Sequence, residues 1–192
     1  MADGTLKVGT ITTSSGSGTI TLGQSGETVD MSNGTMTLNS TMKNTPAFLA
    51  RSIAQQDISD NTWTKVQFTS EDYDTNNTYD NSSNYRFTPG VAGKYNLYSQ
   101  VGAYGISAAS QSFAISIYKN GTDYIQQRQA YAGNDIESGG TYALHTSGTV
   151  DVGASDYFEV YLRVNSNSTD VRIDYNSTRL YTFFGAYRII GA

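Results

Sequence analysis

Segment 71–84, EDYDTNNTYDNSSN, carries carboxylate and amide side chains at two-residue intervals over much of its length. Such oxygen atoms are the ligands that calcium prefers in proteins. The segment departs from the EF-hand loop, because Asn77 and Ser83 stand at the sixth and twelfth positions, where that loop has glycine and glutamate. We therefore interpret it either as a calcium site or as a solvated loop between two strands, and we expect no other cofactor. The candidate ligands are Asp72, Asp74, Asn76 and Asp80.

A catalytic role would depend on His145, which is the only histidine in the chain. No Gly-x-Ser-x-Gly motif accompanies it, so a nucleophilic serine on a strained turn is not indicated. The Gly93-Lys94 pair lacks the spacing of a phosphate-binding loop. The 17 acidic residues are scattered, and nothing in their spacing indicates the carboxylate pair of a glycosidase. We therefore predict that the protein is not an enzyme and that His145 is a polar surface residue.

The composition indicates the kind of secondary structure that would position a binding site. Charged residues make up 15% of the 192 residues, and the chain contains 15 Tyr, 19 Gly and only 2 Pro. Tyr and the β-branched residues favour strands while Gly favours turns, so the chain is predicted to be all-β. A net charge of −5 without a basic cluster argues against nucleic acid as a partner.

Several absent features narrow the expected environment. The chain has no Cys, which excludes disulfides and thiolate metal sites. Its first residues contain no apolar segment of the kind found in signal peptides. The longest apolar-leaning run, 180–190, is too short to span a membrane. We expect a soluble protein that is made in a cytoplasm and does not insert into membranes.

Residues 1–45 differ from the rest of the chain. They are rich in Gly, Thr and Ser, contain no aromatic residue, and repeat Gly-Thr before an apolar residue at irregular intervals. The apolar residues form thin strand-like pairs that one chain cannot bury. We interpret the region as a β arm or stalk whose pairs pack against sister chains, and a flexible linker is the alternative. The apolar arm residues are Ile20, Leu22, Val29, Met31, Met36 and Leu38.

Residues 46–192 show short strand patterns separated by turn signals, without helical periodicity. About ten strands are expected, which predicts a sandwich or jelly roll. Several strands carry aromatic residues on both faces. One face would fill the core and the Tyr-rich second face would mark an interface, unless Tyr is present only as a good strand former. The interface candidates are Tyr95, Tyr98, Tyr104, Tyr157, Tyr161, Tyr181, Phe183 and Tyr187.

An ordered set of motifs runs through this second region. In chain order they are Pro46-Ala47-Phe48; Phe87, Pro89, Gly93 and Tyr95; Lys119-Asn120-Gly121; Gly153-Ala154-Ser155-Asp156; and Phe183-Phe184-Gly185. In this order they resemble the C1q-like domain of the C1q/TNF-like superfamily. The closing motif departs from the family, since Ala186-Tyr187 stands where Phe-Leu is frequent.

The resemblance implies a ten-strand jelly roll that assembles as a homotrimer and buries aromatic faces along its three-fold axis. Animal members carry a collagen or coiled-coil stalk, but residues 1–45 show no Gly-X-Y repeat. This Gly/Thr-rich region is instead similar to the N-terminal parts of virion structural proteins of marine bacteriophages. The resemblance therefore implies a viral protein that is located in the virion and made in the cytoplasm of a bacterial host.

Two non-catalytic functions follow from these expectations. In the favoured one, the chain is a short tail fibre or adhesin whose head, 46–192, binds a glycan or protein of the host surface. The ligand would be held by loops at 71–84, 105–111, 132–140 and 165–170, which are rich in Tyr, Asn, Asp and Gly. In the alternative, the chain is a capsid decoration or head-fibre protein, and residues 1–45 dock it on other virion proteins.

Overall fold

The computed structural model describes residues 11, 25–26, 28–30, 32–38, 42–106, 112–130, 140–166 and 170–191. The chain divides into two units, Met1–Thr37 and Leu38–Ala192. Among the apolar arm residues, Val29 and Met36 are about half exposed, and Leu38 is partly buried. Ile20, Leu22 and Met31 lie outside the described residues, so their packing stays a prediction.

The described part of the second unit consists of strands and turns, which confirms the all-β prediction. Five of its thirteen strands have only two residues, and this accounts for the excess over the expected ten. The strands are β1 (Ala47–Arg51), β2 (Gln56–Asp57), β3 (Thr64–Lys65), β4 (Ser70–Asp74), β5 (Tyr79–Asp80), β6 (Arg86–Phe87), β7 (Gly93–Ile106), β8 (Ser112–Lys119), β9 (Thr122–Ala130), β10 (Gly140–Val152), β11 (Phe158–Asn165), β12 (Arg172–Ile173) and β13 (Phe183–Arg188).

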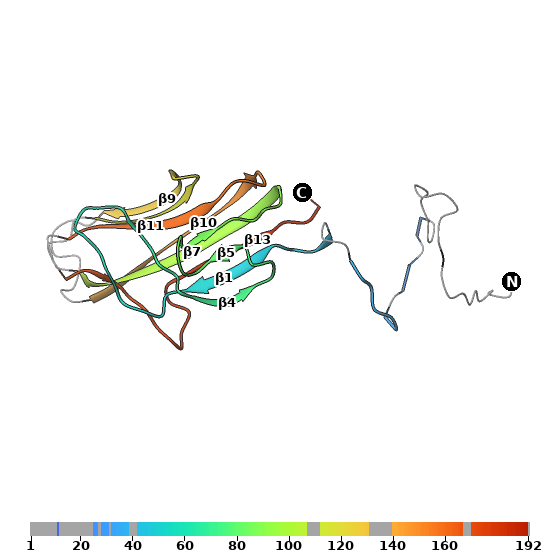
Figure 1. Ribbon diagram of the computed structural model, residues 1–192, viewed down its shortest axis with the longest axis horizontal. Coiled ribbons are helices and arrows are strands. Elements are labelled where there is room, and N and C mark those ends of the chain that lie inside the picture. The colour runs from blue at the N-terminus through green and yellow to red at the C-terminus, as the bar shows by residue number, and fades with distance from the viewer. Residues whose placement is uncertain are drawn as a thin grey trace. The chain divides into compact units, whose positions relative to one another are not determined.

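These strands form two antiparallel sheets that pack face to face (Figure 1). Sheet A has the order β2-β12-β7-β13-β1-β4. In addition, β10 pairs with β7 along the length of that strand. Sheet B has the order β5-β6-β11-β8-β9, and β3 also pairs with β11. Because β1 and β13 are neighbours in sheet A, the beginning and the end of the head lie side by side.

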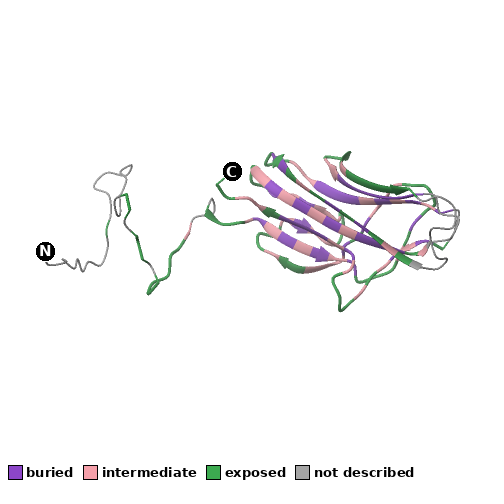
Figure 2. Cartoon of the chain, turned by 180° about the vertical axis from the view of Figure 1, so that it is seen from behind, coloured by how far each residue is buried: buried purple, intermediate pink, exposed green. Residues whose placement is uncertain are grey.

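The core follows the two-residue period of the strands. On β7, Leu97, Val101 and Ala103 are fully buried, whereas Tyr98 and Tyr104 belong to the opposite face. Figure 2 shows this alternation as bands of buried and intermediate residues along the strands. The buried face of each sheet therefore meets the other, and both sheets keep an outer face.

Four aromatic rings from distant parts of the chain meet at the centre of this core. The Phe48 ring lies 4.8 Å from Tyr79, 4.6 Å from Phe87 and 5.0 Å from Phe184, measured between centroids. Burial raises the pKa of the Tyr79 hydroxyl, which donates to the carbonyl oxygen of Phe68. Phe48, Phe87 and Phe184 come from three of the motifs quoted above, so those motifs mark the core.

Two further motifs, the turns at 119–121 and 153–156, are joined through one carboxylate. Asp156 accepts hydrogen bonds from the Gly153 amide at 2.7 Å and the Asn120 side chain at 2.8 Å. Its other contact is the Lys119 ammonium at 2.8 Å. Lys119 and these hydrogen bonds lower the pKa of Asp156 to about 2. The carboxylate thus stabilises the end of sheet B where β8 and β11 meet.

Replacing Asp156 by asparagine is expected to lower the free energy of unfolding at pH 7 by about 1–2 kcal/mol, because charge-assisted hydrogen bonds are lost. The folded pKa lies below the ordinary value of 3.8, so the carboxylate stabilises the protein above about pH 4. This stabilisation is lost as the pH falls towards 2. Urea unfolding at fixed protomer concentration should therefore show a difference between the two proteins that shrinks over this range.

The matched control is Asp57→Asn. Asp57 is exposed and accepts one hydrogen bond from the Gln55 side chain. This control should stay within about 0.5 kcal/mol of the wild type. An Asp156→Asn difference as small as that of the control at pH 7 would contradict the stabilising role of Asp156.

Candidate functional site

The outer face of sheet A carries a cluster of aromatic side chains from β4, β7, β13 and the segment just before β13. The Tyr98 ring lies 6.2 Å from Phe183 and 6.3 Å from Tyr187. Tyr73 and Tyr187 are 45% and 39% exposed, although aromatic rings of this size are usually buried. We call Tyr73, Tyr98, Tyr181, Phe183 and Tyr187 the aromatic face.

Two glycines let these rings lie flat on the sheet. Gly185 pairs with Tyr98 in the register of β13 and β7, and a side chain at Gly185 would collide with the Tyr98 ring. Gly102 likewise lies beneath the Tyr181 ring. Burial raises the pKa of the Tyr98 hydroxyl, and the neighbouring hydroxyls of Tyr73 and Tyr187 raise it further. The Tyr98 hydroxyl therefore stays protonated at neutral pH.

A strip of small and polar side chains lies beside the aromatic face on β10. Ala143, His145, Ser147 and Thr149 are all exposed, and they share the outer face of sheet A. Ser147 is the direct neighbour of Tyr98 in the register of β10 and β7. Because the Tyr98 ring leans toward Gly185 on β13, it leaves this small-residue strip uncovered. Sheet A thus presents two neighbouring patches on its outer face. The aromatic face is raised by its large rings, and the small-residue strip beside it is lower.

Five of the eight predicted interface residues share this face: Tyr98, Tyr104, Tyr181, Phe183 and Tyr187. The assignment of Tyr95 to the interface is wrong. Its ring is fully buried in the core, and its hydroxyl donates to the carbonyl oxygen of Val91 at 2.9 Å. Tyr95 and Tyr98 are three residues apart on one strand, so they point to opposite faces.

Tyr157 and Tyr161 are separated from these five residues, because both lie on the outer side of sheet B, and their place in an interface stays a prediction. Tyr161 packs on Tyr118 at 4.2 Å, and burial and the neighbouring Glu159 raise its pKa to about 12. Tyr157 lies against the Arg86 guanidinium at 4.8 Å. Both tyrosines therefore belong to a different surface of the jelly roll from the aromatic face.

The structure does not bring the predicted calcium ligands together. Asp74 accepts hydrogen bonds from the amides of Thr78 and Tyr79 at 2.6 and 2.7 Å, and Asp72 pairs with Arg51 at 3.0 Å. Asp80 is bonded within its own turn to residues 82–84, and those amides lower its pKa. The Asn76 side chain accepts a hydrogen bond from the Thr75 hydroxyl. Within the described ranges, no group of three acidic, His or Cys side chains could hold a metal ion.

No protein-family model and no curated protein matches this chain. Among solved structures, the globular domain of zebrafish complement 1qA protein matches with a TM-score of 0.51 and 10% identity, covering 75% of this chain and 97% of that chain. The Eiger TNF of S. frugiperda matches with a TM-score of 0.55 and 13% identity, covering 76% of this chain and 93% of that chain. The fold is a C1q/TNF-like jelly roll. The predicted fold class is thereby confirmed, and identities this low establish the fold alone.

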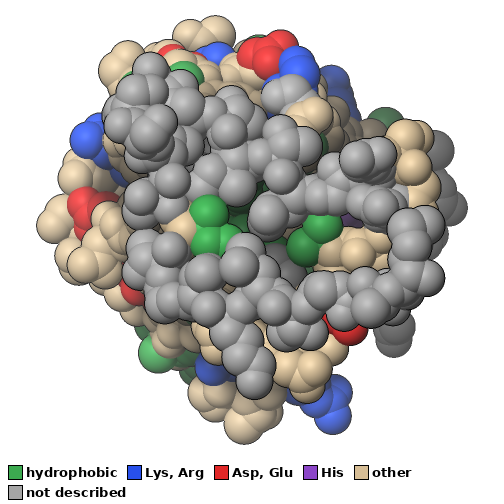
Figure 3. Space-filling view, turned by 90° about the vertical axis from the view of Figure 1, so that its right-hand side faces the viewer, with side chains coloured by type: hydrophobic (Ala, Val, Ile, Leu, Met, Phe, Trp, Pro, Cys, Tyr) green, Lys and Arg blue, Asp and Glu red, His purple; other side chains and the backbone are tan. Residues whose placement is uncertain are grey.

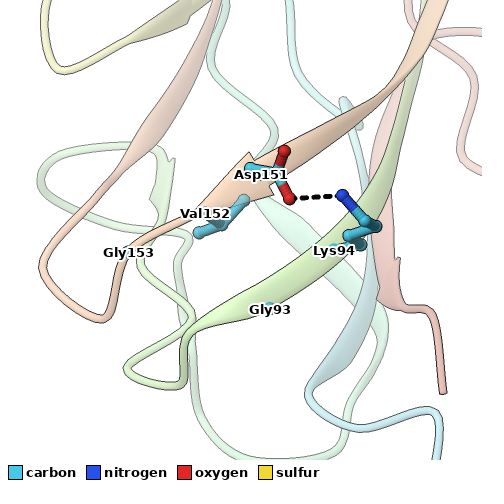
Figure 4. A pocket seen from close by; sticks show the side chains of 5 residues that line it. All are labelled: Gly93, Lys94, Asp151, Val152 and Gly153. Carbon is cyan, nitrogen blue, oxygen red and sulfur yellow. Dashed lines mark hydrogen bonds and ion pairs between the residues drawn. The ribbon is translucent and has the colours of Figure 1, made fainter. Parts of the chain in front are cut away.

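One end of the jelly roll holds a cavity of about 320 Å³ between β7 and β10 (Figure 4). Gly93, Val152 and Gly153 line it together with Lys94 and Asp151, whose side chains form an ion pair at 2.6 Å. Its five lining residues offer no nucleophile beside a free base, so they form no hydrolytic site. His145 is exposed on β10 and is not among the residues that line this cavity.

Side chains of both charge signs are visible around the rim of one face of the molecule (Figure 3). Figure 3 shows Lys and Arg side chains interspersed with Asp and Glu around the visible face. Within the part of the chain that the structure describes, no helix is long and apolar enough to cross a membrane.

Proposed function

We propose that this protein is a non-catalytic homotrimer that binds a ligand on a biological surface, with the aromatic face of sheet A buried around the three-fold axis. The aromatic face beside the small-residue strip is the observation that carries this proposal. Exposed aromatic patches on soluble domains are typical of protein interfaces. Tyrosine suits such an interface because its ring packs while its hydroxyl keeps a polar partner.

The presence of two different patches on one sheet favours a cyclic assembly over a two-fold dimer. In a cyclic assembly the raised patch of one copy meets the low patch of the next, and the contacts close into a ring. Tyr98 and Tyr187 of one protomer would pack against Ala143, Ser147 and their neighbours in the next. The residues named in the two patches include no Lys, Arg, Asp or Glu side chain, so burying them requires little desolvation of charge.

In the finer form of this proposal, the chain is a bacteriophage virion protein, most simply a short tail fibre whose head binds a host-surface glycan or protein. The Gly/Thr-rich composition of residues 1–45 and their similarity to phage virion proteins support it. The second candidate is a capsid decoration or head-fibre protein that docks on the shell through residues 1–45. That candidate is favoured by the half-exposed Val29 and Met36, which a foreign subunit could cover.

A comparison of the full-length protein with a version that starts at Thr45 distinguishes a tail fibre from a capsid decoration protein. We expect both versions to be trimers by light scattering, since the aromatic face lies in the head. In a fibre, sister chains bury the arm, so limited proteolysis should leave residues 1–45 intact. In a decoration protein, protease should cut the arm until isolated capsid shells are added. Monomers in both versions would contradict the trimer proposal itself.

A further inference from the structure

A small hollow lies on the outer face of sheet B, on the opposite side of the jelly roll from the aromatic face. It has a volume of about 70 Å³ and is lined by Trp63, Ser112, Ala114, Gln126, Arg128 and Arg163. A single water needs about 10–15 Å³ of such space, so the hollow admits a group of several heavy atoms but not a whole sugar ring. Among the described residues, none of those that line the hollow belongs to the loops expected to bind a ligand.

The strand register explains why the hollow forms. Ala114 of β8 pairs with Arg163 of β11 on one side and with Arg128 of β9 on the other. Its neighbours Phe113 and Ile115 face the core, so Ala114 faces outward. A methyl group between two long side chains leaves a depression with a guanidinium at each side.

The two arginines bring positive charge to the hollow. The Asn61 side-chain oxygen holds Arg163 by accepting hydrogen bonds from Nε at 3.0 Å and Nη2 at 2.6 Å. This acceptor is neutral, and neither Arg163 nor Arg128 forms an ion pair with any described residue. The nearby Asp123 carboxylate is bonded to the side chains of Ser116 and Gln126. Two guanidinium groups without an ion-pair partner among the described residues, on a chain of net charge −5, favour an anionic ligand.

Trp63 supplies the apolar part of the same site. Its indole packs at 6.0 Å against Tyr118, which fixes the ring at the edge of the hollow. A fixed aromatic face beside a polar pocket binds flat ligands that have one apolar surface, while side-chain amides such as that of Gln126 bond hydroxyl groups. Guanidinium groups bind carboxylates through paired hydrogen bonds.

We infer that this hollow binds the carboxylate of an acidic sugar within a polysaccharide, with Arg128 and Arg163 on the carboxylate and Trp63 against the sugar ring. The inference rests on the proposed binding function and names its ligand class. The outer face of sheet B stays exposed when sheet A is buried, so a trimer presents three such sites to one polymer. Simultaneous engagement of several sites strengthens attachment well beyond the affinity of one.

Calorimetric titration of the full-length protein with a hexamer of galacturonic acid tests this inference. A glucose hexamer and a hexaglutamate peptide serve as comparison probes, and light scattering on the same samples reports the assembly. We expect binding of the acidic hexasaccharide alone. Arg128→Gln and Trp63→Ala should each weaken it at least about tenfold, the effect of losing one charge-assisted hydrogen bond or a comparable ring contact. Arg179→Gln removes the same charge from an exposed loop and should leave binding unchanged.

Three results would overturn the acidic-sugar site while leaving the trimer in place. They are an absence of binding by a protein of trimeric mass, equal binding of the peptide or the neutral hexasaccharide, and binding that neither Arg128→Gln nor Trp63→Ala alters. A monomeric mass would instead count against the proposed function. Unchanged circular dichroism of both variants would confirm that any lost binding reflects the site.

Discussion

Replacing Tyr98 by lysine is expected to convert the trimer into monomers at micromolar protomer concentration. Tyr98 lies between Phe183 and Tyr187 at the centre of the aromatic face. An ammonium group buried there without a partner costs several kcal/mol at each of three contacts, which is more than a hundredfold in each association constant. Light scattering measures the mass directly, and circular dichroism shows whether the jelly roll is retained.

Two further variants show whether a loss of the trimer reflects the interface or a defect in folding. Tyr187→Lys changes a side chain that is 39% exposed in the protomer, so it should dissociate the trimer with less effect on folding. Tyr124→Lys places the same substitution on β9 of sheet B, where the ring is 49% exposed, and it should remain trimeric. If Tyr98→Lys and Tyr187→Lys both keep a trimeric mass, the interface does not include the aromatic face.

Replacing Phe48 by alanine is expected to lower the free energy of unfolding by about 3–5 kcal/mol, which is the cost of emptying a large buried aromatic site. Phe48 is fully buried and contacts the rings of Tyr79, Phe87 and Phe184. Those rings come from both sheets, so the resulting cavity loosens the contact between them. Chemical denaturation, monitored by tyrosine fluorescence, measures the decrease in the free energy of unfolding.

Phe48→Leu keeps the prediction testable if the alanine variant does not fold, because leucine fills most of the site and should cost about 1–2 kcal/mol. Val91→Ala serves as the surface control, since Val91 is 42% exposed, and it should change stability by less than about 0.5 kcal/mol. A Phe48→Leu variant as stable as the wild type would show that these rings do not form the main stabilising cluster.

The two-residue period of the strands made much of this fold predictable. It separates Leu97, Val101 and Ala103 from Tyr98 and Tyr104 on β7, and the structure places them on opposite faces. The motif residues Phe48 and Phe184 also proved to be central, because neighbouring strands bring the two ends of the head together.

Sheet membership could not be predicted, because it depends on pairing between distant strands. Tyr161 and Tyr98 have similar local patterns, but one lies on sheet B and the other on sheet A. The hollow near Ala114 could not be predicted either, because its walls come from three strands, β8, β9 and β11, that are brought together by pairing. The outward position of Trp63 could have been predicted from the sequence. Val66 and Phe68 are buried, and the two-residue period places Trp63 and Lys65 on the opposite side of this segment.

The four candidate calcium ligands are not gathered in one place, because spacing along the chain does not report where carboxylates point. Asp74 ends β4 and Asp80 ends β5, and each bonds the amides of the turn that follows it. Such Asx-type bonding is the common role of Asp at the start of a turn. Asp72 lies within β4 and pairs with Arg51 across the register of β1 and β4.

The mass of the full-length protein in solution, measured by light scattering over a range of concentrations, decides whether the protein is a trimer. We expect three times the chain mass of 20.8 kDa. That mass should stay constant on dilution to micromolar protomer and should fall to one chain in Tyr98→Lys. A wild-type protein that has the mass of one chain, or of two, at every concentration would contradict the trimer proposal.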